Sequence, residues 1–97
     1  MDDCPFRAQD AIPQIAPTHR FQWEEAQQCY VILYPEGMVK LNGSAAEILK
    51  LCNGEMSVAE LIRDLKAQFP DADVAADVVR FLQVANENGW ICAKRSS

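Results

Sequence analysis

The pattern of apolar and polar residues predicts strands in the first half of the chain. Residues 20–24 (RFQWE) alternate, with both aromatic residues on one face, as in a half-buried strand. Residues 29–34 (CYVILY) are apolar on both faces, which is typical of the middle strand of a small sheet. A turn is expected at residues 35–37, where proline presets φ and glycine accepts the positive φ that closing a hairpin often requires. Residues 38–41 (MVKL) then return as a shorter strand, which completes a three-stranded antiparallel meander.

Three short helices are expected after these strands. The first is predicted to begin at Ser44, which starts the Ser-x-x-Glu spacing of a capping box, and to end at Asn53–Gly54. The second repeats the box at Ser57 and stops at Pro70, and its buried face is expected to carry Leu61, Ile62, Leu65 and Phe69. The third covers about residues 73–88. Three strands followed by three helices, the last two forming a helix–turn–helix pair, predict a winged-helix-like α+β domain.

The two ends of the chain differ from this central region. Residues 1–17 contain three prolines and little periodicity, and are expected to form an extended or partly disordered arm. Ile12 and Ile15 are candidates to anchor the arm to the body of the domain or to a neighbouring copy. The domain itself is predicted to cover residues 18–92 and to end in a short extended piece. Residues 93–97 are polar and expected to be a flexible tail.

Composition and charge narrow the possible partners. The chain has 97 residues, 49% hydrophobic and 24% charged, which suits one small globular domain. Its net charge of −5 gives no electrostatic attraction to nucleic acid or to an anionic membrane. No stretch approaches the roughly 20 apolar residues of a membrane span. The first residues, MDDCPFRAQD, are acidic and contain proline, unlike a signal peptide, so a cytoplasmic location is expected.

The third predicted helix would be the recognition helix of a helix–turn–helix, and its charge is a separate reason to exclude DNA binding. It carries Asp73, Asp77 and Glu87 against a single Arg80. The negative phosphates along a DNA groove repel an acidic helix, so no nucleic-acid partner is expected.

The residues that carry enzyme chemistry do not form a recognisable pattern. The four cysteines, Cys4, Cys29, Cys52 and Cys92, include no C-x-x-C pair, and His19 is not spaced from any of them as a zinc site requires. A nucleophile needs a base that is itself oriented by a partner, and one histidine at the start of a strand does not supply that arrangement. We therefore expect no catalytic residues, no metal site, no cofactor and structural thiols.

The returning strand is the most informative candidate site. Edge strands are normally protected by proline, bulges or charge, and this strand has one lysine and no proline. Either the arm or the C-terminal piece covers the edge, or the edge accepts an extended peptide as an added strand. The third helix would supply a second wall, although ordinary core packing is an alternative for two of its residues, Phe81 and Val84. Arg80 is the candidate to pair with an acidic peptide side chain. The predicted peptide-binding residues are Gly37, Met38, Val39, Lys40 and Leu41 on the strand and Asp77, Arg80, Phe81 and Val84 on the helix.

The stretch VILYPEGMVKLNGSAAEILKLCNG, followed later by NENGWI, resembles the PqqD family of pyrroloquinoline quinone (PQQ) biosynthesis. The resemblance runs from about Pro17 to Ile91 and includes RFQWEEAQ. The YPEG-x-V-x-LN-x-SAAEIL string is its most specific part. Cys52 stands where the resemblance leads us to expect a polar or variable residue.

The resemblance implies a protein without catalysis of its own, similar to the RiPP recognition element that captures precursor peptides. The implied peptide is PqqA, which the family presents to the radical S-adenosylmethionine enzyme PqqE. In modules of this type the peptide adds beside the third strand and lies against the third helix, which here means residues 37–41 and 77–84. An alternative from another class is an assembly protein that dimerises through the same edge or through the arm. A monomer or a weak homodimer is expected.

Overall fold

The computed structural model of the chain describes residues 5–94. The expectations about Cys4 and about the last three residues of the tail therefore lie outside the described residues. In chain order the elements are a 3-10 helix, η1 (Pro5–Arg7), two strands, β1 (Pro13–Ile15) and β2 (Arg20–Glu24), a hairpin of β3 (Cys29–Tyr34) and β4 (Gly37–Lys40), three helices, α1 (Gly43–Lys50), α2 (Val58–Gln68) and α3 (Val74–Glu87), and a last strand, β5 (Ile91–Ala93).

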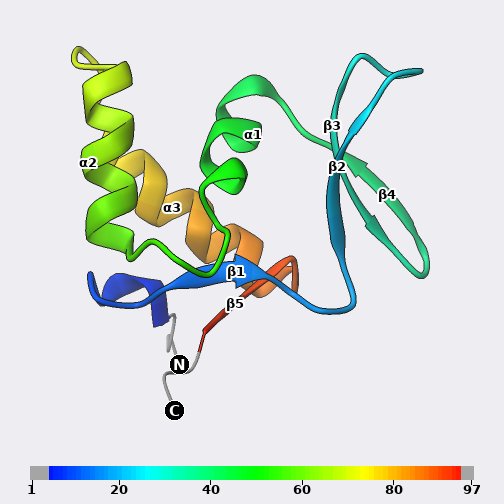
Figure 1. Cartoon of the computed structure of the whole chain (residues 1–97), viewed down its shortest axis with the longest axis horizontal. Helices are drawn as coiled ribbons and strands as arrows, with labels where there is room; N and C mark the ends of the chain where they lie inside the picture. The colour runs from blue at the N-terminus through cyan, green and yellow to red at the C-terminus, as the bar shows by residue number, and fades with distance from the viewer. Residues whose placement is uncertain (1–4, 95–97) are drawn as a thin grey trace.

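The predicted meander and the three helices that follow it are confirmed. Strands β2, β3 and β4 form an antiparallel sheet in that order, and Figure 1 shows it at one side of the molecule, with α1 between it and α2. Val31 and Ile32, which point to opposite faces of β3, are both fully buried, as expected of a middle strand.

The aromatic residues of the sheet lie on the face that meets the helices. Phe21 stacks on Tyr30 with 4.8 Å between ring centroids, and Trp23 meets the same ring edge-on at 5.2 Å. Val39 of β4 packs against the buried cluster from this face as well. Each such contact adds to the burial of apolar area, so this face fixes the sheet on the helical half.

The β3–β4 turn forms without the positive φ that we expected of Gly37. Gly37 is instead the first residue of β4, where it pairs with Tyr34, and within residues 5–94 the glycines with positive φ are Gly54 and Gly89. Pro35 and Glu36 alone therefore make the reversal, and the hairpin has a two-residue loop.

The described part of the predicted arm packs against the body of the domain. Strand β1 pairs antiparallel with β5, an arrangement the sequence did not predict, and Phe6 of η1 is fully buried in the core. The backbone N–H of Ala16 also donates to the carbonyl of Trp90 at 2.9 Å. The boundary placed between residues 17 and 18 stays a prediction, but residues 5–16 contribute to the same core.

Two details of the helices differ from expectation. Helix α1 begins at Gly43 because its N-cap is Asn42, two residues before the predicted cap Ser44, and the Asn42 side chain accepts a hydrogen bond from the Ala45 N–H at 2.8 Å. The capping box at the start of α2 is present as predicted. Phe69, expected on the buried face of α2, is 45% exposed because that helix ends at Gln68 and the next residue leaves the helical conformation.

The capping difference can be tested by stability. Replacing Asn42 by alanine removes the side-chain acceptor for a helix N–H and should lower the free energy of unfolding by about 1 kcal/mol. The control is Ser44→Ala, which sits inside α1 and should change stability by less than about 0.5 kcal/mol. Urea unfolding followed by circular dichroism measures both, and a larger loss for Ser44→Ala would contradict the assignment of the cap.

Candidate functional site

The outer edge of β4 is open within the part of the chain that the structure describes. β4 is a terminal strand of its sheet, with β3 as its neighbour. The two segments that were candidates to cover it, the arm and the C-terminal piece, pair with each other as β1 and β5. Among residues 5–94, neither the arm nor the C-terminal piece covers this edge.

The hydrogen-bond register shows which groups of β4 face outward. The N–H of Leu41 donates to the carbonyl of Tyr30 at 3.0 Å, so this pair bonds toward β3. Because such pairs alternate along an antiparallel ladder, Val39 also bonds toward β3, whereas the N–H and C=O groups of Met38 and Lys40 point away from it. These two residues offer the main-chain donors and acceptors that an added strand needs.

Little in β4 protects this edge from pairing. The strand contains one charged residue, Lys40, and no proline, and its register with β3 continues over four residue pairs without a bulge. Met38 is 40% exposed, so an apolar side chain also lies at the edge. The edge is therefore suited to a guest strand.

The predicted residues of α3 share one face of that helix, as their spacing of three and four residues requires. Asp77, Arg80 and Val84 are exposed, and Val84, at 43%, is not a core residue. Phe81 is half-buried against Trp90, with ring centroids 6.5 Å apart, so the core alternative holds in part for Phe81. Within residues 5–94 the Arg80 guanidinium makes no ion pair.

The predicted site residues on β4 and those on α3 do not pack on each other. Helix α3 packs mainly on α2, β5 and η1, whereas β4 packs mainly on β3. Figure 1 shows the hairpin and α3 on different sides of α1. The nine predicted residues therefore form two separate patches, and one ligand that touches both must extend beyond the strand edge.

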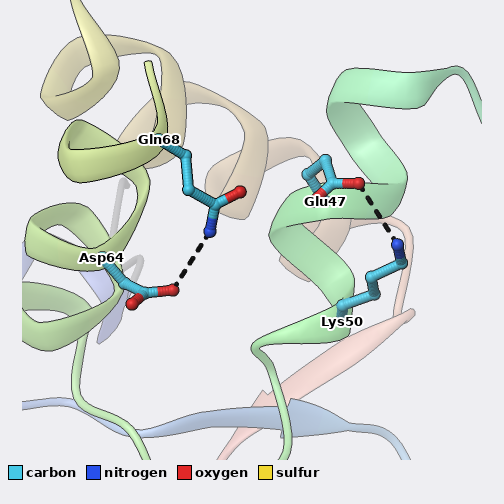
Figure 2. A network of polar contacts seen from close by, with 4 residues as sticks. All are labelled: Glu47, Lys50, Asp64 and Gln68. Carbon is cyan, nitrogen blue, oxygen red and sulfur yellow. Dashed lines mark hydrogen bonds and ion pairs between the residues drawn. The ribbon is translucent and has the colours of Figure 1, made fainter. Parts of the chain in front are cut away.

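Sequence reasoning missed a groove that lies between α1 and the α2–α3 connection. It has a volume of about 430 Å³, and Asp77 lines it together with exposed Phe69. Figure 2 shows polar pairs on the two flanking helices: the Lys50 ammonium bonds to Glu47 at 3.2 Å on α1, and the Gln68 amide donates to Asp64 at 3.3 Å on α2. The available signal was the Phe-Pro pair at the end of α2, which ends the helix before Phe69 can turn inward.

The titratable groups of the structure match a binding role better than a catalytic one. Cys52 is buried, and this burial raises the pKa of its thiol to about 12, so the thiol is protonated and unreactive at neutral pH. His19 is held by Thr18, with 2.9 Å between its Nδ1 and the hydroxyl, and stacks on Tyr34. Within residues 5–94, no three His, Cys, Asp or Glu side chains gather as a metal site would require.

Comparison with known proteins places this fold in a class of peptide-recognition modules. The solution NMR structure of the PqqD part of Methylobacterium extorquens PqqCD is similar, with a TM-score of 0.72 and 26% sequence identity over 98% of this chain and 100% of that one. That protein is described as a functional, stand-alone RiPP recognition element. Its similarity supports the α+β architecture described above.

Sequence comparison identifies the family. The model of "Coenzyme PQQ synthesis protein D (PqqD)" matches residues 29–91. The PqqA binding protein of Azotobacter vinelandii is 53% identical over 81 residues, which cover 82% of this chain and 88% of that protein. The PqqA binding protein of Acinetobacter baylyi is 56% identical over 75 residues, 76% of each chain. The chain belongs to the PqqD family.

The names of these relatives describe a binding protein and a recognition element, in agreement with the prediction that this chain is not an enzyme. Across residues 5–94, none of the helices combines the length and the apolar character needed to cross a bilayer.

The direction of the β4 backbone groups can be tested by amide hydrogen exchange. The N–H groups of Val39 and Leu41 bond toward β3 and should be protected, whereas those of Met38 and Lys40 should exchange at least roughly tenfold faster. Exchange followed by NMR in the free protein measures all four. Equal protection of the four amides would show that something covers the outer edge.

Proposed function

We propose that this chain is a peptide chaperone that binds the precursor peptide PqqA and presents it to the radical S-adenosylmethionine enzyme PqqE in PQQ biosynthesis. The observation that carries the proposal is the unprotected outer edge of β4, where Met38 and Lys40 offer unpaired backbone groups within the described structure. Relatives that are about half identical are named PqqA binding proteins, which supports the choice of ligand. The cytoplasm stays the predicted location.

The peptide would bind by adding a strand to the sheet. Its main chain pairs with Met38 and Lys40, which provides affinity with little dependence on sequence. Specificity then comes from side-chain contacts, for which Arg80 and Val84 on α3 are the exposed candidates. An acidic peptide side chain would pair with the Arg80 guanidinium. Because the two patches are separate, the peptide must continue past the end of the added strand to reach α3.

The benefit to the enzyme is one of effective concentration. A peptide held by the chain near the catalytic pocket of PqqE meets that pocket as a nearly intramolecular partner, which in general is worth about 10²- to 10⁴-fold in affinity. The peptide becomes ordered on binding, which offsets part of the interaction energy. In this role the chain itself needs no cofactor.

The same edge also fits a second candidate function, an assembly protein that pairs β4 with β4 of another copy. The observation in its favour is identical: a strand edge without proline or bulge. Titration of labelled PqqA into the chain, followed by sedimentation, separates the two. Saturable binding to a monomer supports the chaperone, and self-association without peptide binding supports the assembly protein.

A proline at an outward-facing position tests docking at β4. Lys40→Pro removes an N–H that does not bond to β3, so the hairpin should persist while affinity for PqqA falls at least roughly fivefold, equivalent to one hydrogen bond of about 1 kcal/mol. Lys40→Ala is the matched control, because it removes the side chain and keeps the N–H. Val39→Pro is less informative, since that N–H faces β3. Calorimetry showing equal affinities for Lys40→Pro and Lys40→Ala would exclude main-chain pairing at this edge.

Charge reversal at α3 tests the second patch. Arg80→Glu should weaken PqqA binding roughly tenfold, because a charge-assisted hydrogen bond is replaced by repulsion of an acidic peptide group. Arg63→Glu, at an exposed site on α2, makes the same change of charge and should leave affinity within about twofold. If both variants bind PqqA equally well, Arg80 does not contact the peptide.

A further inference from the structure

The groove between α1 and the α2–α3 connection has the chemistry of a protein-docking surface. Most of its lining is apolar, and its charged members, Glu47 and Asp77, are both acidic. Its volume of about 430 Å³ is enough for one or two bulky side chains. The lining residues are Gly43, Ser44, Glu47, Ile48, Leu65, Phe69, Ala72, Val74, Asp77 and Val78.

Phe69 is the exposed aromatic residue of this groove. It is 45% exposed, although the burial of an aromatic side chain is worth several kcal/mol in a core. Ser44, which does not cap α1, also lines the groove. An exposed aromatic ring next to polar groups is typical of a partner surface.

Charge defines the kind of partner. Glu47 and Asp77 line the groove, Asp71 and Asp73 lie in the neighbouring connection, and no Lys, Arg or His is among the lining residues. Lys50 neutralises part of this charge through its 3.2 Å pair with Glu47. A second copy of this chain, with its net charge of −5, is electrostatically disfavoured here. A segment that carries lysine or arginine around an apolar anchor is favoured.

We propose that this groove docks PqqE, through a segment of that enzyme in which lysine or arginine flanks one bulky apolar side chain. This inference rests on the proposed function, in which PqqE is the protein partner. The groove has helical walls and includes neither β4 nor the exposed Arg80 and Val84 of α3. Asp77 is the one predicted peptide-binding residue that also lines it, so a peptide that pairs with β4 and reaches Arg80 leaves the rest of the groove to the enzyme. Presentation of a bound peptide requires such simultaneous binding.

The experiment titrates full-length PqqE against labelled chain, with and without saturating PqqA, by fluorescence anisotropy. Phe69→Ser should weaken PqqE binding roughly tenfold or more by removing the aromatic contact. Trp23→Ser is the matched control, because Trp23 is exposed to the same degree, 46% against 45%, on the sheet. Glu47→Lys should also weaken PqqE binding, while Glu55→Lys, an exposed residue outside the groove, should not. PqqA affinity should be unchanged in all four variants.

The possible outcomes distinguish a failure of the docking proposal from a failure of the proposed function. Lost PqqE binding with intact PqqA binding in Phe69→Ser and Glu47→Lys supports the proposal. Wild-type binding of PqqE that neither variant alters overturns the groove and leaves presentation intact. A wild-type chain that does not bind PqqE overturns both. If PqqA and PqqE compete for the chain, the groove binds the peptide and the proposal is overturned. If the chain forms a homodimer that Phe69→Ser dissociates, the groove binds a second copy and the proposal is likewise overturned.

Discussion

The pairing of β1 with β5 is the constraint on which the rest of the structure depends. It joins residues that lie far apart in the chain, such as Gln14 and Cys92, and it uses the backbone groups of both terminal segments. It also holds η1 against α3, so that Phe6 can complete the core. Because these segments bond to each other, neither is available to β4. The open edge is therefore a consequence of how the ends of the domain are arranged.

Local patterns in the sequence predicted the central part of the fold well. The alternation before β3, the apolar run of β3 itself and the capping box at Ser57 each depend on neighbouring residues, and each predicted element is present. The β1–β5 ladder was not predictable in this way, because three-residue strands have almost no periodic signal and their partner is distant. Phe6 was missed for the same reason: its burial depends on a contact with α3, not on its own neighbours.

In the candidate site, too, local features were predictable from the sequence and features that depend on tertiary contacts were not. The sequence predicted which strand forms the edge and which α3 residues share a face. It did not predict that Met38 and Lys40, not Val39, carry the outward backbone groups, because that follows from the register with β3. The separation of the strand patch from the helix patch, and the groove beside Phe69, depend on how the sheet and helices pack. These are properties of the tertiary structure, and the local patterns of a single sequence do not reveal them.

The β1–β5 ladder has one more consequence, for proteins in which this domain is joined to another. The first and last strands lie side by side, and Figure 1 shows them apart from the β3–β4 hairpin. A linker attached before β1 or after β5 would therefore leave the domain from the same region and would not cross the open strand. A fusion at either end of the chain therefore leaves the edge of β4 accessible. The similar Methylobacterium domain is itself part of a longer polypeptide, PqqCD.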